Sequence, residues 1–254
     1  MPRPERSART RSFLFRGGTR IAGTVIACDA TTGGDLLFLS HARARDRQAL
    51  RRARTRTGRA QILTTTETLA LLGTDGDRLR SRALLVAPGR PFTLGNLRLE
   101  LLPSGHLPGA TVLACDGGDK RVLYAGAARL GTPALGAAPG AVRAVDALCI
   151  DATFGHPRFA FVAREEAEAA TCRFAHAARD ARAAAVVLAA AFGPAQDLAA
   201  ALAADGWKLR GHRSTVAAAA AYRRAGVPIP PIGRFAGSLG ADEILLWPAA
   251  HRSA

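Results

Sequence analysis

Lysine is almost absent from this 254-residue chain, and long apolar runs are absent altogether. Lys120 and Lys208 are the only lysines among 35 basic residues, so the formal net charge of +15 comes almost entirely from arginine. No uncharged apolar run approaches the ~20 residues that span a bilayer, so we expect no membrane-spanning helix. The first residues are basic but lack the apolar centre of a secretory signal. We therefore expect a flexible basic arm over residues 1–12 and a cytoplasmic protein.

Cysteine is also scarce and shows no metal-binding or redox spacing. The four cysteines Cys28, Cys115, Cys149 and Cys172 are scattered, and no two form a Cys-x-x-Cys pair. Three of them lie in apolar, strand-like runs. This pattern favours buried, reduced thiols over disulfides.

Several common catalytic signatures are missing as well. The sequence has no Gly-x-Ser-x-Gly elbow, no phosphate-binding Gly-x-x-x-x-Gly-Lys loop and no dinucleotide fingerprint with its acidic partner. These absences argue against a serine hydrolase of that type, a P-loop enzyme and a classical dehydrogenase.

What the chain does have is a strong positive charge. With 35 basic against 20 acidic residues and a pI of about 11.4, its field attracts polyanions. A genome rich in arginine and alanine would produce the same total, and this explanation stays open. A cluster is better evidence than a total, and one segment concentrates the candidate nucleic-acid-binding residues. They are Arg43, Arg45, Arg47, Arg51, Arg52, Arg54, Arg56 and Arg59.

The first half of the chain predicts a sheet-rich lobe over residues 13–145. Short apolar runs bounded by glycine, proline and aspartate indicate strands, and Thr66 is the expected cap of a helix that Gly73 ends. A loop rich in glycine, proline and alanine is expected at 131–141. The expected strands are 21–28, 35–40, 60–64, 83–87, 97–102, 110–115 and 120–125, with a helix at 46–55 that carries the arginines.

The second half predicts a small parallel α/β lobe over residues 146–254. The strand at 146–151 is expected to open it, and strands and helices then alternate. The helices are expected at 163–181, 194–204 and 214–225, and the further strands at 185–190, 207–210 and 243–247.

Five phrases in order along roughly residues 20 to 230 resemble known motifs. Together they are similar to the metallo-β-lactamase fold and its β-CASP nucleic-acid hydrolases, in particular the bacterial ligase-associated DNA exonucleases, which are related to mRNA 3′-end processing factors. The resemblance implies an α/β fold, a metallo-β-lactamase-like αβ/βα sandwich followed by a partial β-CASP-like α/β lobe that is shortened at its C-terminal end. The phrases are LFLSHARARD (37–46), PSGHLPGA (103–110), VLYAGA (122–127), DALCIDATFG (146–155) with REE (164–166), and AFGPAQDL (191–198) with GH (211–212) and YRRAGV (222–227).

The resemblance also implies a site for one or two zinc-class ions. By motif, Asp29 matches the opening carboxylate, and His41 and His106 keep the family's residue type. Asp46 stands where the last histidine of the His-x-His-x-Asp-His phrase is expected and offers oxygen instead of nitrogen. The retained donors are therefore His41, Asp46 and His106.

Three further ligand positions have lost their donors. Arg43 and Arg45 carry a permanent positive charge and no lone pair, and Ala127 replaces a carboxylate. Two fixed charges near a dication oppose its binding by ~1 to 4 kcal/mol per pair. We therefore expect a vestigial site and no cofactor, with Zn²⁺ or Mn²⁺ present only if the protein is active.

Other candidate positions each have a structural alternative. Asp151 ends an apolar strand and matches the family's acidic motif, which makes it a candidate catalytic residue, or it caps the turn through Thr153. Gly193 and Gln196 open a helix after a strand, a geometry that can bind phosphate. For the remaining histidines we expect surface or cap roles; they are His156, His176, His212 and His251.

Three functions remain open from the sequence. The favoured one is a degenerate exonuclease relative that binds nucleic acid, DNA rather than RNA, in DNA repair without hydrolysis, with a DNA ligase or other repair protein as a partner suggested by the resemblance. The second is an active metal-dependent hydrolase with a reduced site. The third is an interaction module without enzymatic activity, whose charge reflects base composition alone. Nothing in the sequence indicates an oligomeric state.

Overall fold

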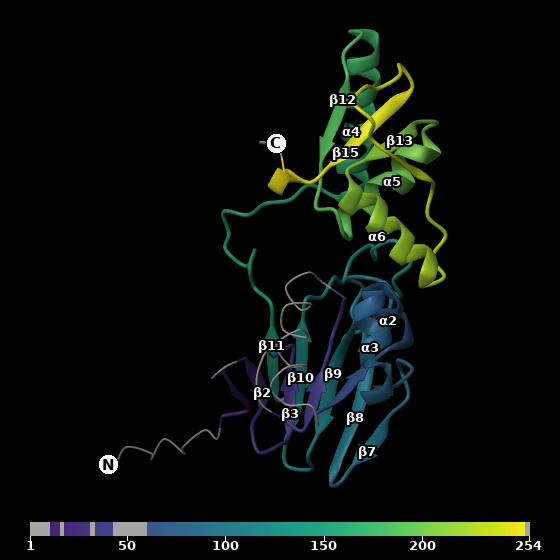
Figure 1. The fold of residues 1–254 in the computed structure, drawn as a ribbon. Helices are drawn as coiled ribbons and strands as arrows, with labels where there is room; N and C mark the ends of the chain where they lie inside the picture. The colour runs from purple at the N-terminus through teal and green to yellow at the C-terminus, as the bar shows by residue number, and fades with distance from the viewer. Residues whose placement is uncertain (1–10, 16–17, 31–33, 43–59, 252–254) are drawn as a thin grey trace, which may run out of the picture.

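The structure is a computed structural model that describes residues 11–15, 18–30, 34–42 and 60–251. Two sheets pack face to face, and a third sheet with its own helices lies beyond the ends of their strands (Figure 1). The α/β class predicted from the sequence is confirmed. The arginine cluster from Arg43 to Arg59, the helix expected at 46–55 and Asp46 lie outside the described residues.

The first sheet has six strands in sequence order, of which the last four are parallel. Two of its central strands, Ile26–Cys28 and Leu36–Phe38, are triplets that are buried along their whole length, as expected for parallel strands covered on both faces. The strands are β1 (Phe13–Leu14), β2 (Thr19–Ile21), β3 (Ile26–Cys28), β4 (Leu36–Phe38), β5 (Gln61–Thr64) and β6 (Ala83–Leu85).

The second sheet is mostly antiparallel and contains one strand that the sequence analysis places in the second lobe. β11 pairs in parallel with β10, so the expectation that residues 146–151 open the second lobe is wrong. Cys149 packs against the core between the first two sheets, whereas Leu148 and Ile150 are exposed. An apolar strand does not reveal from its sequence which sheet it joins. The strands are β7 (Phe92–Leu94), β8 (Leu97–Pro103), β9 (Thr111–Asp116), β10 (Arg121–Gly126) and β11 (Ala147–Ile150).

An apolar core fills the space between these two sheets. Alternate residues of each strand point inward, as the two-residue period of a strand requires. Phe38 meets Tyr124 edge to face across this core, with ring centroids 6.1 Å apart. The fully buried members include Ile26, Phe38, Leu63, Leu99, Leu101 and Leu113.

Helices cover the outer face of the first sheet. α2 (Thr66–Leu72) begins one residue earlier than expected, because Thr65 is its N-cap and accepts a hydrogen bond from the Thr68 backbone N–H. Gly73 ends α2 as predicted, and α3 (Thr74–Leu79) and the turn η1 (Arg80–Arg82) follow it.

The second lobe is built on a fully parallel sheet, as predicted, in the order β12-β15-β13-β14. Only β14 was missed, because Pro230 and Pro231 before it obscure a strand of three residues. The elements are α4 (Arg164–Asp180), β12 (Ala185–Leu188), α5 (Pro194–Ala204), β13 (Lys208–Gly211), α6 (Arg213–Arg224), β14 (Ile232–Arg234), β15 (Glu243–Trp247) and η2 (Ala249–His251).

The two lobes share one hydrophobic core. It runs from the outer face of the first sheet through α2 and α3 to α5, α6 and the third sheet, and α2 packs directly against α6 (Figure 1). A third, smaller core lies on the outer face of the second sheet, where Ala128, Ala141 and Val145 from the loop between β10 and β11 cover it. The lobes are therefore held by apolar burial as well as by polar contacts.

The cysteines and the helices can also be compared with the sequence-based expectations. All four cysteines are free thiols, with Cys28 and Cys115 buried, as predicted. Among the helices in the described ranges, none is both long and apolar enough to cross a membrane.

Candidate functional site

Five polar side chains meet at or near the strand ends in the first lobe, and we call them the inner cluster: Asp29, Ser40, His41, His106 and Tyr124. Asp29 follows β3, Ser40 and His41 follow β4, His106 lies in the turn after β8, and Tyr124 belongs to β10. The structure thus brings Asp29 together with residues from three of the quoted phrases.

The carboxylate of Asp29 organises this cluster. Its Oδ1 accepts a hydrogen bond from the Ser40 backbone N–H at 2.9 Å, and its Oδ2 accepts from Ser40 Oγ at 2.5 Å. The Tyr124 hydroxyl donates to the same Oδ2 at 3.1 Å. Burial raises the pKa of Asp29, although these three hydrogen bonds oppose the shift. Burial and the neighbouring Asp29 charge also raise the pKa of Tyr124, so its hydroxyl keeps its proton.

Ser40 determines the tautomer of His41. Ser40 Oγ lies 2.6 Å from His41 Nδ1 and already donates its single proton to Asp29. His41 Nδ1 must therefore carry the proton and donate it to Ser40 Oγ, which leaves Nε2 as the acceptor nitrogen. The His41 and His106 rings meet edge to face with centroids 5.0 Å apart.

Gly126 lets the end of β10 approach this cluster closely. Its φ of +49° lies in the left-handed region, and a Cβ there would lie 3.4 Å from both Asp29 Oδ2 and Ser40 Oγ. The next residue, Ala127, offers no donor atom where the resemblance predicts a carboxylate.

The turn that carries His106 is fixed by the loop after β10. A Cβ on Gly105 would lie only 2.1 Å from the Arg129 carbonyl oxygen, so the two backbones touch. The Arg129 N–H donates to the Ser104 carbonyl at 2.7 Å, and the Ala134 N–H donates to the Gly105 carbonyl at 3.0 Å. The position of His106 therefore depends on this loop.

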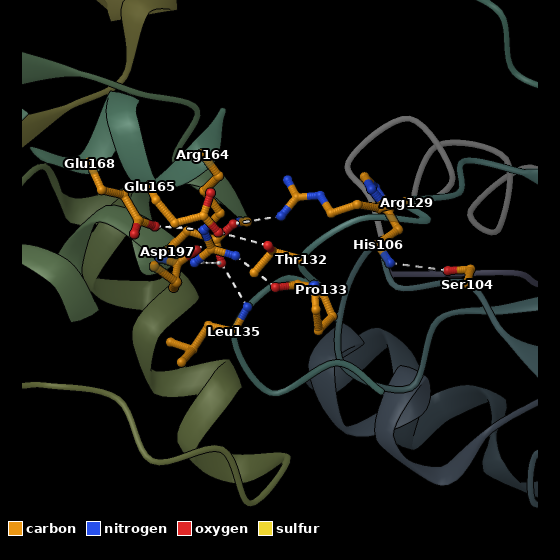
Figure 2. Close-up of polar contacts among 12 residues, drawn as sticks. Ser104, His106, Arg129, Thr132, Pro133, Leu135, Arg164, Glu165, Glu168 and Asp197 are labelled. Atoms are coloured by element: carbon orange, nitrogen blue, oxygen red, sulfur yellow. Dashed lines mark hydrogen bonds and ion pairs between the residues drawn. The ribbon is translucent and has the colours of Figure 1, made fainter. Parts of the chain in front are cut away.

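The same loop fastens the two lobes through four residues that we call the interlobe joint: Arg129, Leu135, Arg164 and Asp197. Figure 2 shows the Arg129 side chain extending from the vicinity of His106 toward Asp197. Asp197 is buried and accepts from the Leu135 N–H at 2.7 Å and from Arg129 Nη1 at 3.3 Å, with Arg164 Nη2 at 3.7 Å.

Two further bonds support this joint. Arg164 Nη1 donates to the Pro133 carbonyl at 2.6 Å, and the Thr132 hydroxyl donates to Glu165 at 2.7 Å (Figure 2). Arg129 and Leu135 share one loop, but Arg164 and Asp197 lie on two helices far from it in the sequence, and sequence reasoning did not identify the joint. The spacing of Arg129, Arg164 and Asp197 along the chain matches no recognisable motif.

The donors in the described part of the chain do not fit a metal cage. Within those ranges no three histidine, cysteine, aspartate or glutamate side chains are grouped as metal ligands. The Asp29 carboxylate accepts hydrogen bonds from Ser40 and Tyr124. Asp46, Arg43 and Arg45 lie outside the described residues.

Asp151 behaves as the structural alternative predicted. It is exposed after β11, and its Oδ1 accepts from the Thr153 backbone N–H at 2.9 Å and from Thr153 Oγ1 at 2.5 Å. Its backbone N–H donates to the Gly126 carbonyl at 2.8 Å, which connects this turn to the end of β10.

The α5 N-terminus is closed to phosphate. Gln196 is fully buried, and its Oε1 accepts from the Gly193 N–H at 2.7 Å while its Nε2 donates to the Ala191 carbonyl. Asp197 adds a negative charge to the same turn. The phosphate-binding interpretation of this helix start is not supported, because the Gly193 N–H already donates to Gln196 and the Asp197 carboxylate would repel a phosphate.

The other histidines have local roles. His212 is the N-cap of α6, and the His156 ring accepts from the Arg158 N–H at 3.2 Å. His176 lies 2.8 Å from Asp205, a partner that the sequence did not reveal. His251 is exposed and stacks on His212 with centroids 4.8 Å apart.

No family model matches the chain, and no curated protein matches it.

Proposed function

We propose that this chain is a nucleic-acid-binding relative of the metallo-β-lactamase and β-CASP nucleases in which the hydrolytic metal site has been lost, and that its ligand is DNA. The observation that carries the proposal is the inner cluster. His41 and His106 come from two of the motif-like phrases, Asp29 precedes them in the chain, and the three side chains meet at one end of the strands, beside Gly126. Such convergence supports a common origin with proteins that use these positions together.

The chemistry of this cluster favours loss of hydrolysis. In metal-dependent nucleases the ion generates hydroxide and stabilises charge on the phosphate. Here Ala127 has no lone pair, the sequence has arginines at 43 and 45, and Asp29 bonds to Ser40 and Tyr124. The chain's own residues thus form a stable polar cluster that positions the strand ends.

The positive charge supplies the binding energy in this proposal. Arginines that neutralise phosphates release counterions from nucleic acid, and this release drives association. The place in DNA repair and a DNA ligase partner enter the proposal through the resemblance to ligase-associated exonucleases.

Salt-dependent binding tests the proposal directly. We expect a labelled DNA oligonucleotide to bind with an affinity that falls steeply as salt rises. Replacing Arg51, Arg52, Arg54 and Arg56 by serine should reduce the slope of log affinity against log salt by about 0.7 to 0.9 per lost phosphate contact. Binding that ignores both salt and these substitutions would contradict the proposal.

A matched variant controls for net charge. It removes four arginines that are exposed and form no ion pair within the described part of the chain. The four are Arg80, Arg173, Arg182 and Arg223. The proposal expects a smaller loss in this variant than in the cluster variant.

Metal content separates the proposal from the active hydrolase. We expect purified protein to contain no stoichiometric Zn²⁺ or Mn²⁺ and to leave DNA intact when either ion is added. Stoichiometric metal with nuclease activity that disappears in His106→Ala would replace this proposal by the hydrolase. DNA binding lost without any metal effect in His106→Ala would instead indicate a structural contribution of this turn.

A further inference from the structure

The carboxyl edge of the third sheet gathers aromatic and cationic side chains that we call the sheet-edge cluster: His212, Arg213, Arg234, Trp247 and His251. Because β13, β14 and β15 are parallel, their last residues meet at the same edge, where ligands bind in open α/β sheets. The His212 ring lies 4.8 Å from Trp247 and 4.8 Å from His251, measured between centroids.

The two edges of this sheet differ in how their charges are balanced. At the amino end of β13, Lys208 pairs with Asp242 at 2.7 Å, and Arg210, further along β13, pairs with Glu243 at the start of β15 at 2.6 Å. At the carboxyl edge, Arg213 and Arg234 are exposed and form no ion pair with any described residue. The carboxyl edge therefore presents positive charge that the fold leaves available.

His212 adds a directed hydrogen-bond donor. Its Nδ1 accepts from the Ser214 backbone N–H at 3.2 Å, so the proton of the neutral ring resides on Nε2. Partial desolvation and the nearby charges of His251, Arg213 and Arg234 lower the pKa of His212. An anion at this edge would relieve that repulsion.

Trp247 provides a rigid aromatic surface beside these charges. Its Nε1 donates to the His251 carbonyl at 2.8 Å, and the Phe235 ring supports it with centroids 6.1 Å apart. The indole is only partly buried. An anchored, partly exposed indole is suited to stack on a planar ring, because little conformational entropy is lost on contact.

The geometry points to a binding site for single-stranded nucleic acid at this edge, where Arg213 and Arg234 contact phosphates and Trp247 stacks on a base. The inference rests on the proposed nucleic-acid function and specifies its strand type. Stacking on aromatic side chains requires a base outside a duplex, and it combines with positive grooves in proteins that bind single strands. An acidic protein segment would satisfy the charges but would give no reason for the exposed indole.

Trp247 fluorescence gives a local test on the intact protein. The probes are a single-stranded 12-mer of thymidine, the same sequence in a duplex, and inorganic polyphosphate of equal charge. We expect the single strand to quench tryptophan emission and the polyphosphate to leave it nearly unchanged. Trp207, which is buried, serves as the internal reference that does not respond.

Substitutions connect this signal to the residues. Trp247→Leu should weaken binding of the single strand about 5- to 100-fold, the range expected for one lost stacking contact. Arg213→Ala combined with Arg234→Ala should reduce the salt slope by about 1.4, or about 0.7 per phosphate contact. Arg173→Ala combined with Arg223→Ala removes the same charge elsewhere and should change the slope less.

The outcomes distinguish this inference from the proposed function. If the protein binds DNA but both arginine pairs have equal effects and Trp247 emission does not change, the sheet-edge site is wrong and the general function stands. If polyphosphate quenches Trp247 as strongly as the oligonucleotide does, the edge is an anion site without base stacking, which also overturns the inference. If the wild-type protein binds none of the nucleic-acid probes, both proposals fail.

Discussion

The inner cluster and the sheet-edge cluster both place a histidine beside a serine near strand ends, yet the two histidines have opposite proton positions. His41 donates through Nδ1 to Ser40, which itself donates to Asp29, so His41 Nε2 is an acceptor. His212 accepts through Nδ1 from the Ser214 backbone N–H, so its Nε2 is a donor. The neighbours of a histidine thus decide whether its second nitrogen is suited to a cation or to an anion.

Burial separates the two clusters further. In the inner cluster, Ser40 and Tyr124 donate hydrogen bonds to the buried carboxylate of Asp29. The sheet-edge cluster is surrounded by cations and is partly open to solvent. We infer a positioning role for the inner cluster and propose a binding role for the sheet-edge cluster, so substitutions in the two clusters should differ in kind.

Gly105→Ala should have the largest effect on stability, because it displaces the backbone turn that carries His106 of the inner cluster. The added Cβ would lie 2.1 Å from the Arg129 carbonyl oxygen, and φ at this residue is +73°. Because backbone must move, we expect a loss of about 3 kcal/mol or more in the free energy of unfolding, measured with denaturant. Gly118→Ala has a similar positive φ but open space around it, and should cost less. Equal losses would mean that the contact with Arg129 is unimportant.

Asp197→Ala should follow, by loosening the joint that connects the two lobes. The substitution leaves the Leu135 N–H and Arg129 without their acceptor, and we expect a loss of about 2 kcal/mol, reduced by the partial exposure of both arginines. Asp197→Asn keeps an acceptor for Leu135 and should retain part of the stability. If asparagine were as destabilising as alanine, the charges rather than the hydrogen bond would dominate the joint.

The sequence predicted most of the secondary structure because its periodic patterns are local. The helices 164–180, 194–204 and 213–224 and the parallel sheet follow from apolar spacing and from glycine or proline boundaries. The position of β11 was wrong because sheet membership depends on contacts with β10 that no local pattern encodes.

The candidate site was predictable only in part, for a related reason. Motif order identified Asp29, His41 and His106, which do come together. Ser40 and Tyr124 were within the quoted phrases, but their bonds to Asp29 require knowledge of side-chain direction. The sheet-edge cluster depends on three strands ending at one edge. The positions of His212, Arg234 and Trp247 in the sequence do not show that they lie together until the parallel pairing of β13, β14 and β15 is known.

Tyr124→Phe and Tyr222→Phe each remove one buried hydroxyl, so together they compare a hydroxyl inside the inner cluster with one outside it. Tyr124 donates to Asp29, so its removal should cost about 1 kcal/mol. The Tyr222 hydroxyl is buried and has no hydrogen-bond acceptor among the described residues, so its removal should be neutral or stabilising. Thermal or denaturant unfolding of both variants measures the difference. Equal effects of the two substitutions would show that the hydrogen bond from Tyr124 to Asp29 contributes nothing to stability.

His212→Asn should have the smallest effect, visible mainly as a change with pH. The pKa of histidine in an unfolded chain is about 6.5, whereas the pKa of His212 in the fold is lowered. Between these two pKa values the native state binds fewer protons than the unfolded state. Wild-type stability should therefore fall as pH drops through about 6.5 toward the lower folded pKa. Asparagine still caps α6 but cannot titrate, so the stability advantage of the wild type should shrink between pH 8 and pH 5. A pH-independent difference would show that neither desolvation nor the charges of His251, Arg213 and Arg234 lower the pKa of this ring, and it would weaken the case for an anion at this edge.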